Sequence, residues 1–367
     1  MKKNYFMLAA ATMMLAACAE TDLVNEIAVE ETPQAIGFET FAQKATRVTN
    51  ATTGLATHHE QYYVWAYKST NDQLVFDAEE VNAANNSYGD DIKYWDKAAT
   101  NYYFYASAPS AFTFVGTSKN AAYFTLSNVE LKCTNFTTGL SADATEALKA
   151  NNSDIDYMIA ETDVPTNENA FYDPVNFNFK HILSRLNITI TKEANHTANI
   201  VLNSVTVNGL KTKATTFDSS LEDLNRWVTD QTTVQYTSID GTVTTTAQYV
   251  LECLLIPQAV SYEEVALAGE DSYSHPYICV DYKIENGTDQ SGQPTYEEFK
   301  AFYNLAALFG AEETDNQNTT EDETMVTFSE ACQSTLNITF NPTGIVFSTT
   351  TTNWTAENAN GGNQTID

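Results

Sequence analysis

FNFKHILSRLNITIT (Phe177–Thr191) and the run after it, ANIVLNSVTVNGL (Ala198–Leu210), indicate what kind of fold this chain adopts. Both are rich in Thr, Val, Ile and Phe, residues that fit the pleated, half-buried surface of a strand. Similar runs recur between polar turns: Gln61–Tyr67, Lys93–Trp95, Asn101–Pro109, Ala122–Leu131, Asp156–Glu161, Thr242–Pro257, Tyr277–Ile284, Ser334–Phe340 and Gly344–Trp354. Many short strands with few long helices predict a mostly β protein built of antiparallel β-sandwiches.

Helix signals are sparse. SADATEALKA (Ser141–Ala150) has capping-box spacing before an apolar face and predicts a helix. SSLEDLNRW (Ser219–Trp227) predicts a second, short helix. TYEEFKAFYNLAALF (Thr295–Phe309) has a capping box, but its aromatic spacing also suits a strand, so both interpretations stay open.

The length of 367 residues predicts two domains. We place the break near DPV (Asp173–Val175), which gives an N-terminal β-sandwich domain over 48–173 and a C-terminal one over 174–367. No fixed-period repeat is evident in the sequence.

The first eighteen residues, 1–18, form a targeting signal. Lys2 and Lys3 precede an apolar run, Tyr5–Ala17, that is too short to span a bilayer as a stable helix. The ending LAAC (Leu15–Cys18) matches a bacterial lipobox, in which the thiol of Cys18 is acylated and Cys18 becomes the new N-terminus. We therefore expect a lipoprotein exported through the periplasm to the outer membrane, touching membrane only through the lipid on Cys18. An ordinary signal peptide that happens to contain Cys is the alternative.

Residues 19–47 follow as a propeptide. Residues 19–35 are acidic and polar and predict a tether, whereas IGFETFA (Ile36–Ala42) alternates and predicts a short, half-buried strand. Beyond that strand, Arg47 lies in a polar segment that predicts an exposed loop. The sequence has two other arginines, Arg185 in a predicted strand and Arg226 in a predicted helix.

The composition excludes some partners. The chain has 18 Lys and Arg against 48 Asp and Glu, a net charge of −30, and such a surface repels nucleic acid and anionic lipid. The hydrophobic content of 43% is too high for a disordered acidic chain. We expect a folded protein with no nucleic-acid partner.

Motifs that carry chemistry are missing from the sequence. There is no P-loop, GxGxxG or GxSxG motif, and HHE (His58–Glu60) predicts a solvated pair rather than a metal site. The spacing of Cys133, Cys253, Cys279 and Cys332 suggests neither a zinc ribbon nor a redox pair. They are predicted to be buried thiols, with a disulfide between two of the last three as the alternative. We expect no enzyme, no cofactor and no metal.

Several stretches together resemble the fimbrillin family, the subunits of type V pili. They are the lipobox with its acidic tether, the IGFETF strand followed by ATR, then KYWDKAATNYYFYASAP, DIDYMIA, FNFKHILSRLNITIT with IVLNSVTVNGL, and the closing STLNITF and IVFSTTTTNW. The resemblance runs in order through most of the chain and is weakest over residues 220–330. It implies two transthyretin-like β-sandwich domains joined end to end.

The resemblance also implies a processing pathway. An arginine-specific protease removes the lipidated segment, so that Arg47 is the last residue before the cut and Val48 the mature N-terminus. The removed segment contains the first strand, with Ile36, Phe38 and Phe41.

In that family a neighbouring subunit donates a C-terminal strand. The candidate here is 344–354, with Ile345, Val346, Phe347 and Trp354. Removing one strand leaves an apolar groove and unpaired backbone groups, an edge ready to accept a strand from another chain. The expected partners are other pilus subunits, the protease, and a receptor on a host or bacterial surface.

The resemblance leaves open whether the chain is a stalk or a tip subunit with an adhesion role. The competing hypothesis is a permanently lipid-anchored surface protein that binds glycans or a host protein.

Overall fold

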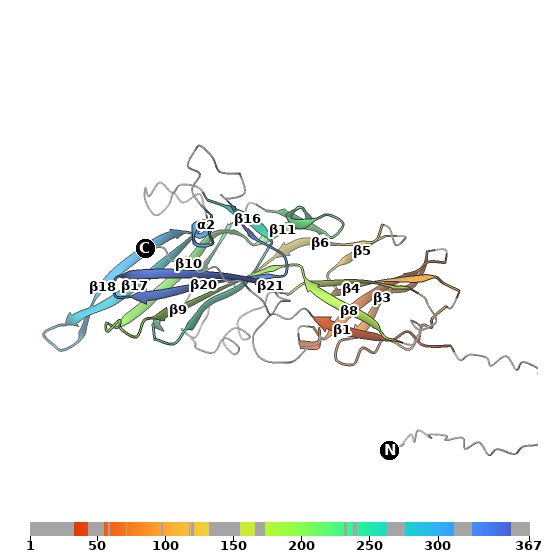
Figure 1. The fold of residues 1–367 in the computed structure, drawn as a ribbon, viewed down its shortest axis with the longest axis horizontal. Coiled ribbons are helices and arrows are strands. Elements are labelled where there is room, and N and C mark those ends of the chain that lie inside the picture. The colour runs from red at the N-terminus through yellow and green to blue at the C-terminus, as the bar shows by residue number, and fades with distance from the viewer. Residues whose placement is uncertain are drawn as a thin grey trace, which may run out of the picture. The chain divides into compact units, whose positions relative to one another are not determined.

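The computed structural model describes residues 33–42, 55–57, 59–70, 72–96, 98–116, 118, 121–131, 155–165, 173–230, 233–237, 241–262, 276–311 and 325–353. Several features predicted above lie outside these residues: the signal 1–18 with Cys18, most of the tether, Arg47, Val48, His58, Cys133, Trp354 and the helix at Ser141–Ala150. The described part is mostly strand with almost no helix, which confirms the predicted mostly β fold (Figure 1). In this part no helix has the length and apolar character needed to cross a membrane.

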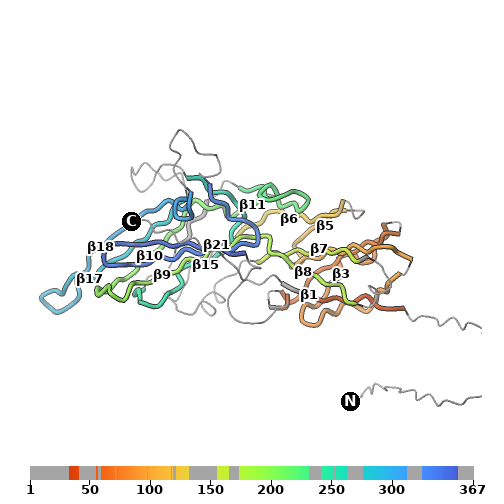
Figure 2. The backbone as a smooth tube through the Cα atoms, viewed as in Figure 1, coloured from red at the N-terminus to blue at the C-terminus, as the bar shows by residue number. Residues whose placement is uncertain are grey.

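One sheet contains six strands in the order β1-β8-β7-β4-β2-β3. Their bounds are β1 (Phe38–Ala42), β2 (Gln61–Lys68), β3 (Gln73–Asn82), β4 (Asn101–Ala108), β7 (Met158–Pro165) and β8 (Val175–His181). The neighbours β2, β3, β4 and β7 pair antiparallel, as predicted, but β1 runs parallel to β8. Figure 2 shows β1 beside β8, although some 130 residues separate them in sequence.

The six-stranded sheet folds over on itself between β7 and β8. These two strands share only the pairs Met158↔His181 and Ile159↔Lys180. Beyond them the β1–β8 pair packs across the face of the other strands, so that the Phe38 ring on β1 lies 5.3 Å from Phe76 on β3. A first apolar core fills the space between the two layers.

The opposite face of this sheet packs on a second, four-stranded sheet. Its order is β12-β11-β6-β5, with bounds β5 (Thr113–Val115), β6 (Tyr123–Glu130), β11 (Lys213–Asp218) and β12 (Trp227–Thr229). Because side chains alternate along a strand, β2 serves two cores. Tyr62 and Val64 point into the first core, and Trp65 and Tyr67 point into the second, between the sheets.

The remaining strands enclose a third core between two further sheets. One has the order β13-β10-β17-β18 with β14 on β10, and the other has the order β15-β9-β20-β21. The bounds are β9 (Ser184–Lys192), β10 (Ile200–Lys211), β13 (Thr233–Thr237), β14 (Gly241–Thr242), β15 (Gln248–Leu255), β17 (Tyr277–Thr288), β18 (Pro294–Asn304), β20 (Cys332–Asn341) and β21 (Gly344–Asn353). A short pair, β16 (Gln258–Ser261) with β19 (Met325–Phe328), flanks this core.

Strand pairing crosses the expected domain break after Asp173. β8, β11 and β12 follow that residue, yet they join the sheets formed by β1 to β7. The division into 48–173 and 174–367, and the transthyretin-like topology of each part, stay predictions.

Two local predictions need correction, and the structure resolves a third that was left open. Lys93–Trp95 is not a strand, because only Tyr94 forms an isolated bridge, to Ala35. The helix expected at Ser219–Trp227 is a single 3-10 turn, η2 (Asp223–Arg226), since Trp227 already pairs in β12. The segment 295–309, for which strand and helix were both open, contains one of each: β18 runs to Asn304 and the short helix α2 (Leu305–Leu308) follows. The Asn304 side chain caps this helix by accepting a hydrogen bond from the Ala307 amide at 3.0 Å.

Candidate strand-exchange site

Strand β1 lies at the edge of its sheet and is joined to its neighbours by backbone hydrogen bonds. It runs parallel to β8 with Phe38 opposite Val175, and the Val175 amide donates to the Gly37 carbonyl at 2.8 Å. On the other side, the Ile36 amide donates to the Lys93 carbonyl at 2.9 Å. An edge strand bound this way separates from its sheet without breaking any other ladder.

The side chains of β1 close the first core. Ile36 is 1% exposed and Phe38 is 5% exposed, whereas Glu39 between Phe38 and Thr40 points to solvent. The alternation predicted for Ile36–Ala42 is thus present where side chains are described. Phe38 is surrounded by aromatic rings at centroid distances of 5.3 to 6.3 Å, contributed by Phe76, Tyr88, Phe104 and Phe177. Truncating a phenylalanine so buried costs about 3–5 kcal/mol, so β1 is a firmly seated filler of this groove.

The groove also has a polar wall. The Tyr88 hydroxyl donates to the Ile36 carbonyl at 2.9 Å, and the Thr40 hydroxyl lies 3.4 Å from Asn86 Oδ1, which also accepts from the Tyr62 hydroxyl at 3.1 Å. Burial raises the pKa of Tyr62 and of Tyr88, so both stay neutral donors. For Phe41 the structure describes only the backbone, which lies opposite Asn178.

The predicted donor segment is a strand of its own. β21 pairs antiparallel with β20 along its whole length, from Gly344 to Asn353, and forms the edge of its sheet. Phe347 is 2% exposed with its ring 4.4 Å from that of Tyr303, while Ile345 and Val346 are half-buried. Phe347 belongs to the third core and Phe38 to the first. The structure therefore does not bring the donor candidate and the groove together within one chain.

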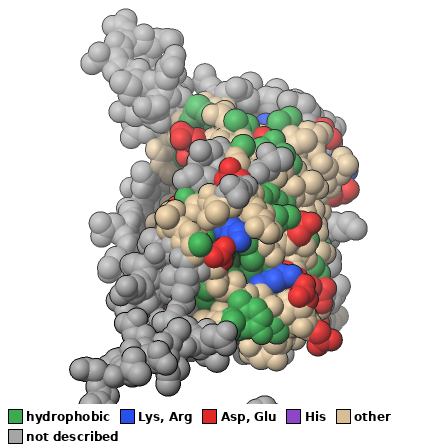
Figure 3. All heavy atoms as spheres, turned by 90° about the vertical axis from the view of Figure 1, so that its right-hand side faces the viewer, with side chains coloured by type: hydrophobic (Ala, Val, Ile, Leu, Met, Phe, Trp, Pro, Cys, Tyr) green, Lys and Arg blue, Asp and Glu red, His purple; other side chains and the backbone are tan. Residues whose placement is uncertain are grey.

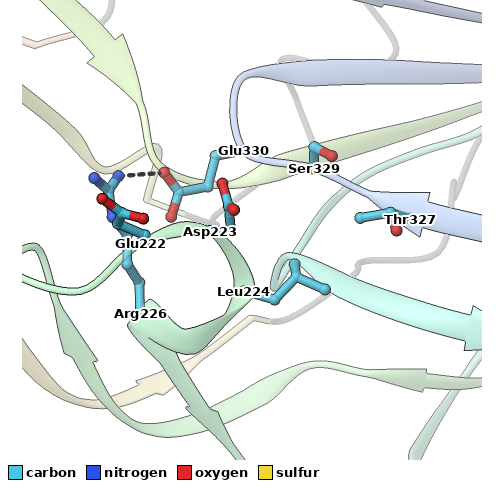
Figure 4. A pocket seen from close by; sticks show the side chains of 7 residues that line it. All are labelled: Glu222, Asp223, Leu224, Arg226, Thr327, Ser329 and Glu330. Carbon is cyan, nitrogen blue, oxygen red and sulfur yellow. Dashed lines mark hydrogen bonds and ion pairs between the residues drawn. The ribbon is translucent and has the colours of Figure 1, made fainter.

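Two of the three arginines are engaged in the fold. Arg226 donates from Nη1 to Glu330 Oε2 at 2.8 Å, beside a hollow whose lining is labelled in Figure 4: Glu222, Asp223, Leu224, Arg226, Thr327, Ser329 and Glu330. Arg185 lies within β9, which is paired on both sides, and burial lowers the pKa of Arg185 to about 10. A protease needs an extended, accessible backbone, and neither residue offers one.

A buried polar cluster was not predicted. His59 is half-buried rather than solvated, with Nε2 2.7 Å from the Asp156 carbonyl, and His181 Nδ1 lies 2.8 Å from Asp156 Oδ2. Burial lowers the pKa of His59 below its usual 6.5, since desolvation outweighs the attraction of Asp156. The only sequence signal was the alternation of Val175–His181, which places His181 inward with the phenylalanines.

Cys253 and Cys279 are buried and Cys332 is half-buried. Because Cys253 and Cys332 are free thiols, no disulfide joins two of these three residues. The described residues contain no group of three or more His, Cys, Asp or Glu placed to hold a metal ion, and His58 lies outside them.

A family model described as fimbrillin-like matches residues 46–354. This chain belongs to the fimbrillin-like family. It is thus a pilus-subunit protein of the cell surface, which associates with other pilus subunits. The match begins beyond β1, so the strand that fills the groove lies outside the part that the family model covers.

A solved structure shows the same fold, and two further ones are similar to a lesser degree. A fimbrial protein from Bacteroides vulgatus is 15% identical with a TM-score of 0.54, and the match covers 88% of this chain and 99% of that one. A protein from Bacteroides ovatus described as a cell adhesion protein is 11% identical, with a TM-score of 0.46 and coverage of 89% and 100%. Another from Bacteroides uniformis is 16% identical, with a TM-score of 0.43 and coverage of 87% and 99%. None of the curated protein sequences compared with this fimbrillin-like chain matches it.

Proposed function

We propose that this chain is the precursor of a structural pilus subunit, exported as a lipoprotein on Cys18 and polymerised by donor-strand exchange after cleavage at Arg47. The observation that carries the proposal is the position of β1. It is an edge strand that fills an aromatic groove, and it ends at Ala42, five residues before Arg47. A cut after Arg47 frees this strand from the rest of the chain.

The precursor is inactive while β1 stays in place. The groove is filled and the backbone of β8 is paired, so no second strand can enter. Once β1 departs, Val175, Phe177 and Phe179 of β8 and the rings around Phe38 lose their cover, and the β8 backbone becomes an unpaired edge. Apolar surface and free backbone groups together favour capture of another strand.

The proposed role of the chain is structural, and a part in cell adhesion is compatible with that role. A fimbrial protein from Bacteroides vulgatus shares the fold. Adhesion to a host or bacterial surface through the assembled pilus is part of the proposal. The function needs no catalysis, cofactor or metal.

The alternative, a lipid-anchored glycan-binding protein, finds little support because exposed aromatic side chains are scarce among the described residues. Stacking on sugars needs exposed rings, and Tyr94, at 51% exposure, is the one aromatic among the large exposed hydrophobic side chains of the described residues. On the face shown in Figure 3, hydrophobic side chains lie in small groups among polar atoms.

The N-terminal residue of the protein recovered from the cell surface tests the proposal. Mass spectrometry of intact chains should find Val48 first, in a high-molecular-weight ladder that resists mild denaturant. Arg47→Ala should leave a lipidated monomer that begins at Cys18. Lys44→Ala, a basic residue in the same segment, is the matched control and should be processed normally. Normal ladders from Arg47→Ala, or a wild-type monomer beginning at acylated Cys18, would overturn the proposal, and the latter would favour the anchored binding protein.

A further inference from the structure

The first residues of the groove-filling segment pair with a wall that is separate from β8. The Ile36 amide donates to the Lys93 carbonyl at 2.9 Å. The Trp95 amide donates in turn to the Gln34 carbonyl at 3.0 Å, so the two stretches run antiparallel. The Trp95 side chain is 7% exposed and packs in the first core, which holds this wall in place.

A tyrosine joins this wall to the segment. The Tyr88 hydroxyl donates to the Ile36 carbonyl at 2.9 Å and accepts from the Lys93 amide at 3.3 Å. The next residue, Gly37, faces the other way, because its carbonyl accepts from the Val175 amide of β8 at 2.8 Å. The segment is therefore bonded on both sides where it enters the groove.

The other half of the segment has one neighbouring strand. Among the described strands, residues 38–42 pair with β8 alone, because β1 ends the strand order of its sheet. A strand with one neighbour opens more readily than one between two neighbours, since fewer hydrogen bonds must break. Arg47 follows this half in the sequence, so a cut after Arg47 leaves the new chain end on the side that is held less firmly.

Burial of side chains follows the same gradient. Ile36 is 1% exposed and Phe38 is 5% exposed, and both belong to the first core. Farther along, Glu39 is exposed and Thr40 is half-buried. The firmest contacts of the segment thus lie at its beginning, far from the cut.

Cleavage breaks none of these contacts. Hydrolysis of the bond between Arg47 and Val48 takes up a water molecule and leaves a carboxylate on Arg47 and an ammonium group on Val48. The hydrogen bonds and apolar contacts of the segment all lie before Arg47, within residues 34–42.

We propose that the cut segment stays bound in the groove as a separate peptide, and that it leaves when another strand displaces it from the Ala42 end. This inference rests on the proposed function, which supplies both the cut and the lipid. Because the lipid is on Cys18, the bound peptide carries the membrane anchor. A cut subunit is then tethered to the membrane without a covalent bond, and the trigger for its release is an incoming strand rather than the protease.

Displacement in this direction keeps the groove covered. A strand that enters beside β8 at the Ala42 end takes over the backbone hydrogen bonds pair by pair. The doubly bonded residues 34–36 are exchanged last. The apolar groove and the β8 edge are therefore never open to water, which protects cut subunits from aggregation before assembly.

Washed membranes that carry the precursor test the tether. After treatment with an arginine-specific protease, the chain that begins at Val48 should sediment with the membranes, together with the lipidated segment that ends at Arg47. Appearance of this chain in the supernatant as fast as the bond is cut would overturn the proposal. Lack of any cut at Arg47 is a different result, because it would overturn the proposed function and this inference with it.

Tyr88→Phe tests the doubly bonded end. The variant keeps the ring and removes the hydrogen bonds of the hydroxyl, so the cut chain should be released about tenfold faster than in wild type. Tyr63→Phe is the matched control, because the Tyr63 hydroxyl donates to exposed Glu80 at 3.1 Å and its ring packs on the second core. Its release rate should stay within about twofold of wild type. Equal rates for wild type and Tyr88→Phe would overturn the role given to residues 34–36.

Synthetic peptides test the direction of displacement. A peptide of residues 38–47 matches the half that pairs with β8 alone, and it should speed release of the cut chain in proportion to its concentration. A peptide of residues 33–37 matches the doubly bonded end and should have no such effect. Release at one rate with either peptide or with none would mean spontaneous dissociation and would overturn displacement. Faster release with the 33–37 peptide would overturn the direction.

Discussion

Phe38→Ala should loosen strand β1 in the unprocessed precursor. The side chain is 5% exposed and contacts the rings of Phe76 and Phe177 at 5.3 and 5.6 Å. Truncating such a phenylalanine costs about 3–5 kcal/mol. Because β1 is an edge strand, most of this loss falls on the equilibrium between docked and released β1. That equilibrium should shift toward release by roughly a hundred- to a few-thousand-fold.

Hydrogen exchange at the Val175 amide measures this shift. The amide is bonded to the Gly37 carbonyl at 2.8 Å, so it exchanges when β1 departs. In Phe38→Ala its protection should fall by the factor given above, while amides of β9 and β20 keep theirs. Glu39→Ala, an exposed side chain on the same strand, is the control and should change protection less than threefold. Equal protection of the Val175 amide in the two variants would refute the claim that Phe38 seats β1 in the groove.

Three further outcomes are expected. The precursor should lose stability as pH falls below about 6.5, because desolvation lowers the pKa of the half-buried His59 and the unfolded chain takes up the proton first. Urea midpoints at pH 7.5 and 5.5 should differ less in His59→Gln than in wild type. Arg226→Gln should destabilise the fold by about 1–3 kcal/mol, since Glu330 loses the guanidinium that lies 2.8 Å away. Burial already raises the pKa of Glu330, so the carboxylate needs this partner. A melting temperature equal to that of wild type would contradict this. Cys332 should react with a maleimide faster in the polymer than in the monomer if β21 is the strand released, because its Sγ donates to Asn353 Oδ1 on β21 at 3.3 Å and burial raises its pKa. Equal rates would argue against release of β21.

Local enrichment in Thr, Val, Ile, Tyr and Phe was enough to predict most strands, and alternation predicted β1. Side chains in a strand point to opposite faces in turn, so burial leaves a period of two in the sequence. β1 and β8 both show it, with Phe38 inward and Glu39 outward on β1, and Phe177 and Phe179 inward on β8. Enrichment in β-branched and aromatic residues, not alternation, predicted β2, β4 and β20, and β2 and β4 are buried on both faces.

Where the backbone departs from regular geometry, the signal failed. β3 was missed because its pairing with β2 shifts register around Ala78, whose φ is +52°, and its exposed face carries acidic side chains that lower strand propensity. Tyr94 was taken for part of a strand because it is aromatic, yet it is 51% exposed and pairs only through one bridge.

The sequence by itself determined the β character of the chain, the inward faces of its strands and its likeness to fimbrillins. The tertiary structure decided which strands meet. Phe38 lies opposite Val175, far along the chain, and β11 returns to β6 across β9 and β10. Such pairings depend on the packing of whole layers, where each strand buries one face against partners distant in sequence, and no local pattern specifies them.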